Sequence, residues 1–421
     1  MKALRASLLV LLFISLVGCS ATDLQLEPRA GTINQETDFA RNNEILLNIV
    51  RASRSQPLNF VPISKASGTQ TTDLKIGLPT ATIGPEQTAM QRQVAFGGNS
   101  WDNSASSSFD SAPLATHDFY SNMLSPIDLQ TANALIRQGF SRELVFYSVI
   151  GSIRLREQSG RVIEVINDPL LDSAEACTPA GDFYGPGADR RVNRSPYAPE
   201  AFSNSNELVR CSFHVFEFLL QAMMKWGVNI ETSSEPNPAY TPDAVKQAKA
   251  AGKDPPAKTI TTSHFCFDPA FADSSQKARV AALPDACGSK KAWSKGGEGQ
   301  DLAVFFTVDG RRSPTYTFTV IPRSPFAMFR YFGRVLRAEE AVPVKLYWHD
   351  GGLTPADDRI LSVSRSVMPS CFAKAFYFGQ YYCVPYEGSD ATKQVFAMLN
   401  QVVALNTTTG SLPTTLEVRL Q

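Results

Sequence analysis

Apolar and polar residues alternate most regularly in the last third of the chain. Tyr316, Phe318 and Val320 alternate with threonines, a period of two that predicts a strand with one buried face. The pattern then changes to a helical period, and Ser324-Pro325 is a typical helix start. Five apolar residues share one face of this helix: Met328, Phe329, Phe332, Val335 and Leu336. Three arginines fall on the opposite face: Arg330, Arg334 and Arg337. We expect a solvated face there, with lipid phosphates as the alternative contact.

The same criteria predict other elements along the chain. A helix should begin near Thr37 and end at Pro57, another should cover 142–155, and the stretch "GGNSWDNSASSS" should be a loop. Further elements are expected as follows: a buried helix over 206–227, strands over 372–378 and 381–384, and a helix over 390–405. Helices and strands alternate irregularly, which favours an α+β fold: a mostly antiparallel sheet with packed helices and long loop insertions near 172–204 and 231–300.

The N-terminal residues have a different pattern. Leu8 to Val17 is almost wholly apolar and follows the basic residues Lys2 and Arg5. The run is about half the roughly 20 residues of a membrane span, which fits the apolar region of a secretory signal peptide. We therefore expect a signal peptide over 1–18, a polar tether over 19–35 and a globular α+β body over 36–421.

The run ends in Leu16-Val17-Gly18-Cys19, which resembles the lipobox of bacterial lipoproteins. In that family the cysteine thiol takes a diacylglyceryl group, the preceding peptide is removed, and the new amino group is acylated. The resemblance implies that Cys19 is lipidated and that its acyl chains form a stable membrane anchor. An aspartate after the cysteine usually retains these proteins in the inner membrane. Ser20 stands there instead, which implies an outer-membrane lipoprotein of the cell envelope that faces the periplasm.

Both ends of the body resemble a second group of sequences. "RNNEILLNIVRASRSQPLNF" and "LNTTTGSLPTTLEVRL" are similar to proteobacterial lipoproteins that have no assigned function. The resemblance covers only these two segments. It brings no catalytic residues with it.

Composition narrows the classes of partner. Of 421 residues, 43% are hydrophobic and 19% are charged, as in a globular body. Without Lys2 and Arg5 the chain has 38 basic and 40 acidic residues, a net charge of about −2. A nucleic-acid-binding protein would need a basic surface, so no nucleic acid is expected. The expected partners are the membrane, through the lipid anchor, and an envelope protein.

Six cysteines remain besides Cys19, and an even number in an oxidising compartment predicts disulfides. They are Cys177, Cys211, Cys266, Cys287, Cys371 and Cys383. Six cysteines allow 15 connectivities. Pairing of neighbours makes Cys177–Cys211 and Cys266–Cys287 the candidate disulfides, and we expect the second to close a loop within the 231–300 insertion. A zinc site is the alternative use of cysteines, but the chain has no CxxC pair.

The third pair of neighbours, Cys371–Cys383, meets a geometric objection. "FAKAFYFGQYYCVPY" predicts a hairpin with Gly379-Gln380 as its two-residue turn. That register places Cys383 opposite Phe376, and Cys371 then lies roughly 16 Å further along the strand. Disulfides need Cα atoms within about 7 Å. We therefore expect no Cys371–Cys383 bond.

No motif for nucleophilic, metal or nucleotide chemistry occurs in the sequence. We therefore assign no catalytic, cofactor-binding or metal-binding residues. His349-Asp350 before two glycines is the best candidate for catalysis, but we expect a hydrogen-bonded turn there. His214 fits a buried histidine on an apolar helix, and His264 has no second cysteine pair near it in sequence.

Charged neighbours give weaker candidates. Asp357-Asp358 and Glu339-Glu340 are adjacent, so their side chains do not face each other. "GSKKAWSKGG" combines three lysines with Trp293, and we expect a surface loop there, with contact to an acidic glycan or lipid as the alternative. Two hypotheses follow. One is a non-enzymatic interaction or assembly module of the cell envelope. The other is a periplasmic hydrolase that uses His349 with nearby carboxylates.

Overall fold

The computed structural model describes most of the chain in several segments. They are residues 35–61, 63–74, 81–82, 93–94, 101–111, 116–156, 160, 162–171, 211–283, 286–288, 301–304, 307–308, 311–312, 316–338, 343–347 and 359–407. Within these segments, no helix is both long enough and apolar enough to cross a bilayer. The predicted signal peptide and Cys19 lie outside them.

The chain forms two compact units. Unit 1 comprises Met1–Leu58 and His117–Thr407, and unit 2 comprises Asn59–Thr116 and Thr408–Gln421. Unit 2 contains a long antiparallel hairpin of β1 (Ile63–Leu74) and β4 (Trp101–Ser111), and a short pair of β2 (Ala81–Thr82) and β3 (Gln93–Val94). The loop predicted for "GGNSWDNSASSS" is therefore wrong in its second part, since β4 begins at Trp101. Polar residues can form a strand because the ladder uses backbone groups, which every one of them carries.

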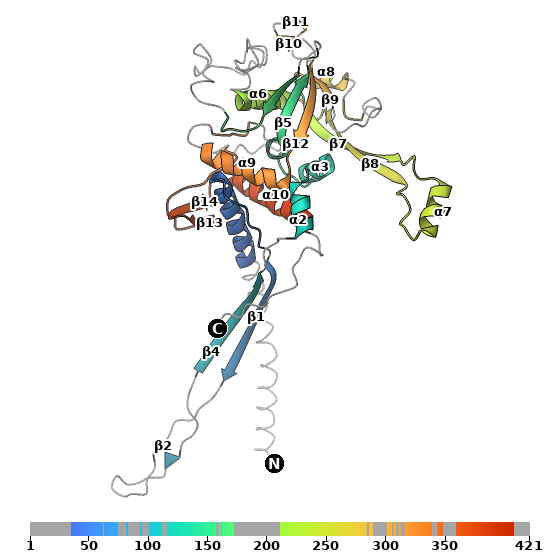
Figure 1. Cartoon of the computed structure of the whole chain (residues 1–421). Helices are drawn as coiled ribbons and strands as arrows, with labels where there is room; N and C mark the ends of the chain where they lie inside the picture. Colours follow the sequence, from blue (N-terminus) through green and yellow to red (C-terminus); the bar gives the residue numbers. More distant parts are fainter. Residues whose placement is uncertain are drawn as a thin grey trace, which may run out of the picture. The chain divides into compact units, whose positions relative to one another are not determined.

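Unit 1 contains a four-stranded antiparallel sheet in the order β6-β5-β12-β9 (Figure 1). Its strands are β5 (Ile150–Arg156), β6 (Val162–Ile166), β9 (Asp301–Val304) and β12 (Tyr316–Pro322). Short strands β10 (Thr307–Val308) and β11 (Arg311–Arg312) form a separate pair. Helices pack against antiparallel sheets, so the predicted α+β class is confirmed.

Several helices of unit 1 lie where the hydrophobic pattern predicts them, but two short helices lie in the predicted 231–300 loop insertion. The first helix of the unit covers residues 35–53. The others are α2 (His117–Leu124), α3 (Leu129–Arg137), α4 (Arg142–Val149), α6 (Ser212–Lys225), α7 (Pro242–Ala250), α8 (Lys277–Ala281), α9 (Pro325–Ala338) and α10 (Asp390–Asn406). In α9 the five predicted apolar residues are buried and the three arginines are exposed, and the Ser324 hydroxyl accepts a hydrogen bond from the Ala327 N–H at 3.2 Å.

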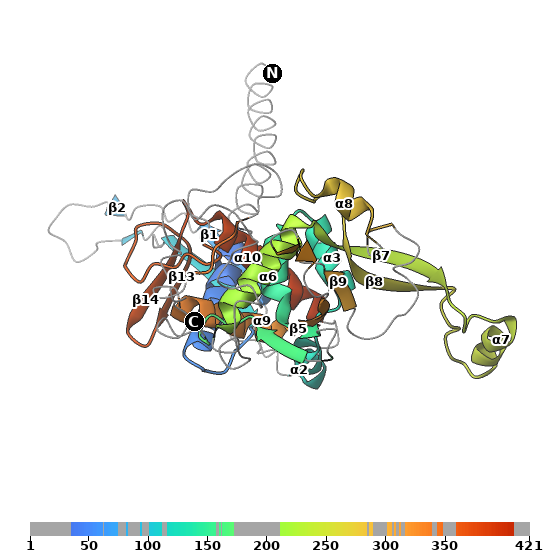
Figure 2. The same ribbon diagram turned by 90° about the horizontal axis from the view of Figure 1, so that it is seen from above.

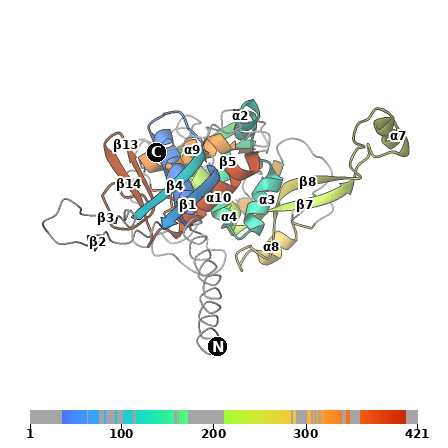
Figure 3. The ribbon, with the colours of Figure 1, turned by 90° about the horizontal axis from the view of Figure 1, so that it is seen from below.

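Helix 35–53, α9, α10 and the hairpin of β13 (Cys371–Tyr377) and β14 (Gln380–Pro385) form a second layer of unit 1 (Figure 3). Several contacts fix the hairpin on this layer. The Lys374 N–H donates to the Asn43 side chain at 2.7 Å, and Phe372 packs edge-on against Phe396 of α10 with ring centroids 5.8 Å apart. The hairpin therefore joins the first helix to the last.

The helix predicted over 142–155 is wrong in its second half, because α4 ends at Val149 and β5 begins at Ile150. Arg323, which lies between β12 and α9, makes this early end possible. Its guanidinium donates to the carbonyls of Tyr147 at 2.7 Å and Ser148 at 3.2 Å, and its backbone N–H donates to Val149 O at 2.6 Å. The last carbonyls of α4, which have no partner within the helix, are thereby satisfied.

Arg323 is buried and holds further elements at the same point. It also donates to the Asn167 carbonyl after β6, and its guanidinium stacks 3.9 Å from the centroid of the Tyr331 ring of α9. Burial lowers the pKa of Arg323 to about 10, so the group is still charged at neutral pH. Gly151 makes room for it, since an added Cβ there would lie 3.1 Å from the Arg323 Cγ.

A long hairpin of β7 (Val228–Pro236) and β8 (Thr259–Phe267) begins just before the predicted 231–300 loop insertion and occupies much of its first half, so the prediction of a loop is wrong there. Helix α7 lies between these strands at their outer end (Figures 1 and 2), and none of its residues is buried. The predicted Cys266–Cys287 disulfide is present, with Cα atoms 5.0 Å apart. Cys211 is also disulfide-bonded, but its predicted partner Cys177 lies outside the described residues.

The expectation for the Cys371–Cys383 pair is wrong, because the structure joins these residues with Cα atoms 5.6 Å apart. The turn residues are Phe378 and Gly379, with φ of 48° and 75°, so the turn lies one residue earlier than predicted. Bulky residues rarely adopt positive φ, which is why the sequence favoured the later turn. Cys383 then pairs with Lys374, and a register irregularity after Cys371 brings the two cysteines together.

We expect Arg323→Met to lower the free energy of unfolding by about 3–5 kcal/mol, because it removes the guanidinium donor of the Ser148 and Asn167 carbonyls and one of the two donors of the Tyr147 carbonyl. Chemical denaturation monitored by circular dichroism measures this loss. Arg330→Met, an exposed position of the same helix, is the matched control and should change stability by less than about 0.5 kcal/mol. Equal effects of the two substitutions would contradict the role assigned to Arg323.

Candidate functional site

Helix 35–53 ends in a tight C-terminal turn that positions Arg54. The Gln56 N–H donates to Arg51 O at 2.9 Å and the Ser55 N–H to Ala52 O at 3.0 Å. Ser55 has a φ of 57°, and this arrangement is a Schellman motif with serine in the left-handed position that glycine usually takes. Because the turn is fixed, the side chain of Arg54 reaches β14, where its Nη2 donates to the Tyr382 hydroxyl at 3.1 Å.

Helix α9 passes very close to the same turn. An added Cβ at Gly333 would lie 2.6 Å from the Ala52 Cβ and 2.6 Å from the Ser53 nitrogen, so only glycine fits without a shift. This close approach places the exposed face of α9 beside Ser53 and Ser55. The arginines of α9 therefore meet the end of helix 35–53.

Two neighbouring hollows lie at this junction and share Ser53, Ser55 and Arg337. The larger has a volume of about 380 Å³ and the smaller about 240 Å³. Five arginines line them together: Arg54, Arg330, Arg334, Arg337 and Arg365. We call this surface the arginine groove.

Positive charge dominates the arginine groove. Among its described lining residues the single carboxylate belongs to Asp168, which is buried and forms an ion pair with Arg334. The described lining residues therefore place five guanidinium groups beside one carboxylate. A guanidinium binds carboxylates and phosphates with two parallel hydrogen bonds, which makes these anions the natural ligands.

The described lining residues of the arginine groove include no histidine or cysteine. The Ser53 hydroxyl already donates to Val50 O within its own helix at 2.7 Å. The arginine side chains instead offer hydrogen-bond donors and positive charge to a ligand.

An exposed apolar rim accompanies the groove. Leu170 and Leu171 beside the smaller hollow are 40% and 45% exposed. On the β13–β14 hairpin, Phe376 pairs with Tyr381 and lies on the opposite face from Gln380 and Tyr382, so it does not border the larger hollow. Buried aromatic and arginine side chains together are typical of protein interfaces, so a partner that covers this rim gains apolar contact as well as charge.

The other predicted candidates lie elsewhere. Residues 348–358, which include His349-Asp350 and Asp357-Asp358, are outside the described part of the chain, as are Glu339-Glu340 and all of the "GSKKAWSKGG" segment after its first glycine. His214 of α6 is half-buried and packs edge-on against Phe213, and His264 is buried on β8. Neither histidine lines the arginine groove.

The sequence indicated only part of this site. It placed Arg330, Arg334 and Arg337 on one exposed face, and the structure agrees. It gave no reason to add Arg54 or Arg365, which are distant in sequence and meet α9 only through the Gly333 contact and the hairpin register.

Comparison with protein-family models, with curated proteins and with solved structures finds no match for this chain, so its functional assignment rests on its own residues.

Proposed function

We propose that the protein is an outer-membrane lipoprotein, anchored through lipidated Cys19 and facing the periplasm, that acts as a non-enzymatic interaction module of the cell envelope. Its binding surface is the arginine groove. The ligand is an acidic segment of an envelope protein. The lipobox Leu16-Val17-Gly18-Cys19 supports the location, and the groove supports the activity.

The observation that carries the binding proposal is the gathering of five guanidinium groups beside one carboxylate among the described lining residues of two adjoining hollows. The whole chain has equal numbers of acidic and basic residues. Such a local concentration repels itself and therefore lowers stability unless an anion neutralises it. A bound acidic segment supplies the missing negative charge.

The extent of the groove favours an acidic protein segment over a single phosphate. The arginines are divided between two hollows that share lining residues, so several carboxylates in series can be bound at once. The apolar rim formed by Leu170 and Leu171 adds contacts that a free anion would not use. Both features match a polypeptide with acidic and apolar side chains.

The double variant Arg337→Ala/Arg365→Ala should bind an acidic peptide about 100-fold more weakly, because each lost charge-assisted hydrogen bond weakens binding roughly tenfold or more. Fluorescence anisotropy with a labelled decaglutamate peptide measures the affinity. Raising the ionic strength to about 0.5 M should weaken binding by the intact protein.

Arg279→Ala is the matched control, since Arg279 is an exposed arginine on α8 outside the groove, and it should bind as the intact protein does. The same measurement with vesicles containing phosphatidylglycerol tests whether the groove binds lipid phosphates. Binding to these vesicles without binding to the peptide would overturn the acidic-segment proposal. An equal loss of peptide affinity in Arg279→Ala would show that binding depends on the net charge of the protein and not on the arginine groove.

The anchor has a separate test. Cys19→Ser should leave an unprocessed or soluble form, because no other cysteine follows the apolar leader directly. Membrane fractionation and the molecular mass of the product distinguish these forms from the wild type. A Cys19→Ser protein that fractionates with the outer membrane as the wild type does would contradict the proposed anchor.

A further inference from the structure

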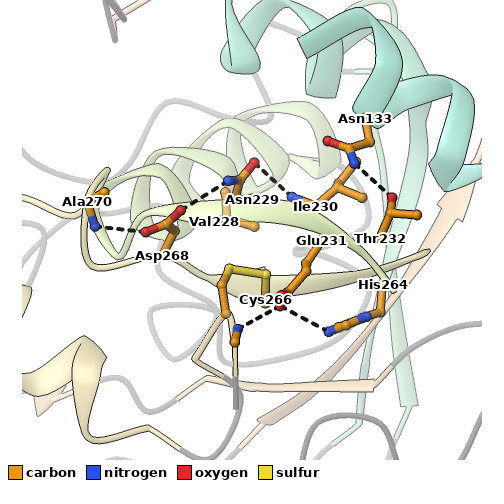
Figure 4. Close-up of a disulfide and its surroundings, with 12 residues drawn as sticks. Asn133, Val228, Asn229, Ile230, Glu231, Thr232, His264, Cys266, Asp268 and Ala270 are labelled. Atoms are coloured by element: carbon orange, nitrogen blue, oxygen red, sulfur yellow. Dashed lines mark hydrogen bonds and ion pairs between the residues drawn. A yellow bond between two sulfur atoms is a disulfide. The ribbon is translucent and has the colours of Figure 1, made fainter. Parts of the chain in front are cut away.

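Residues of metal-binding type meet where β7 and β8 pair (Figure 4). Glu231 of β7 lies directly opposite His264 of β8, and Cys266 follows on the same face of β8. The His264 Nε2 lies 3.8 Å from the Glu231 Oε2. One ligand atom from each of the three residues lies within 4.8 Å of the other two. This cluster lies on a different part of unit 1 from the arginine groove.

The fourth residue, Cys287, is held at this cluster by more than its disulfide to Cys266. Its N–H donates to Phe267 O at 3.0 Å, and Ala286 forms a parallel bridge with Phe267. The Gly288 N–H donates to the Glu231 Oε2 at 2.7 Å. Cleavage of the disulfide would therefore leave Cys287 tied by backbone hydrogen bonds to the same place.

We propose that reduction of the Cys266–Cys287 disulfide converts this cluster into a zinc site with Cys266, Cys287, His264 and Glu231 as its four ligands. The proposal does not depend on the function of the arginine groove. In the oxidised protein the two sulfur atoms are bonded to each other and do not act as thiolate ligands. Reduction supplies two thiolates beside an imidazole and a carboxylate.

The spacing of the ligand atoms fits a tetrahedral ion. Zinc binds nitrogen and oxygen at about 2.0–2.2 Å and sulfur at about 2.3 Å, so neighbouring ligand atoms lie about 3.3–3.8 Å apart. The Glu231–His264 separation of 3.8 Å already falls at the end of this range. Two thiolates with nitrogen and oxygen ligands are typical of zinc, whereas magnesium and calcium prefer oxygen alone.

The burial of the cluster also favours a cation after reduction. Cys266 is fully buried and His264 is 5% exposed. Two thiolates and the Glu231 carboxylate would bring three negative charges into this enclosed position. A divalent cation reduces the total to one negative charge, so the ion lowers the cost of burying the ionised thiols.

The redox step balances with a dithiol as the reductant. Its first thiolate attacks the sulfur of half-buried Cys287, forms a mixed disulfide there and releases Cys266 as the thiolate. The second thiolate of the dithiol then attacks the first sulfur of the dithiol, which is bonded to Cys287 in the mixed disulfide, and releases Cys287 as a thiolate. The dithiol loses two electrons and two protons and becomes a disulfide, and the protein gains two thiols. Zinc then displaces the two thiol protons.

Zinc binding by the full chain before and after dithiothreitol treatment tests the proposal, with the dithiothreitol removed and a chromophoric chelator as competitor. The reduced protein should bind one zinc ion at least about 100-fold more tightly than the oxidised protein, because it has four ligands in place of two. With cobalt in place of zinc, the reduced protein should show a thiolate-to-metal charge-transfer band. The oxidised protein should lack that band.

Variants separate this site from the other cysteines. Cys266→Ser/Cys287→Ser should abolish the tight binding and the charge-transfer band. Cys371→Ser/Cys383→Ser is the matched control, because it removes another disulfide, and it should retain both after reduction. Glu231→Gln changes a partly exposed residue and should weaken binding even if His264→Ala fails to fold. Equal binding by oxidised and reduced protein, or tight binding by reduced Cys266→Ser/Cys287→Ser, would overturn the proposal.

Discussion

The contacts of the buried Arg323 guanidinium hold together the elements on which the rest of unit 1 is built. The residue follows β12 and precedes α9, and it satisfies carbonyls at the end of α4 and after β6. A buried charge is unfavourable unless hydrogen bonds replace its water, so each carbonyl must stay in place. The ring of Tyr331, one face of which lies under the guanidinium, ties the first turns of α9 to the same point.

The direction of α9 determines where the arginine groove forms. With its start fixed at Arg323, the helix crosses the end of helix 35–53 at Gly333, where the backbones approach too closely for any other residue. The Schellman turn then presents Arg54 from one side, and the β13–β14 hairpin adds Tyr382 from the other. The Cys371–Cys383 disulfide closes that hairpin. The arginine groove therefore forms where α9, the end of helix 35–53 and the β13–β14 hairpin meet.

The sequence predicted local structure well where one pattern dominated. The apolar stripe and the Ser324-Pro325 start gave α9 correctly, and the separation of Cys266 and Cys287 gave their disulfide. These features depend on neighbours in the chain. An amphipathic period or a short loop closure is therefore visible in a single sequence.

The sequence failed where tertiary contacts override local preference. A phenylalanine at positive φ moved the β13–β14 turn by one residue, and the register irregularity after Cys371 then reversed the conclusion about its disulfide. Nothing in the sequence pattern singled out Arg323, because its partners are backbone carbonyls, which every residue type carries. The site was found only in part for the same reason, since charge on one helix does not tell which other charges face it.

Photo-crosslinking from the arginine groove in intact cells directly tests whether the groove binds an acidic segment of an envelope protein. A photoreactive residue replaces Ser55, which lines both hollows, and an equivalent substitution at exposed Lys277 of α8 serves as the control. We expect crosslinks from position 55 that map by mass spectrometry to an acidic segment of an envelope protein. Position 277 should not give these crosslinks. Crosslinks from position 55 only to lipid, or to the same proteins as from position 277, would contradict this assignment.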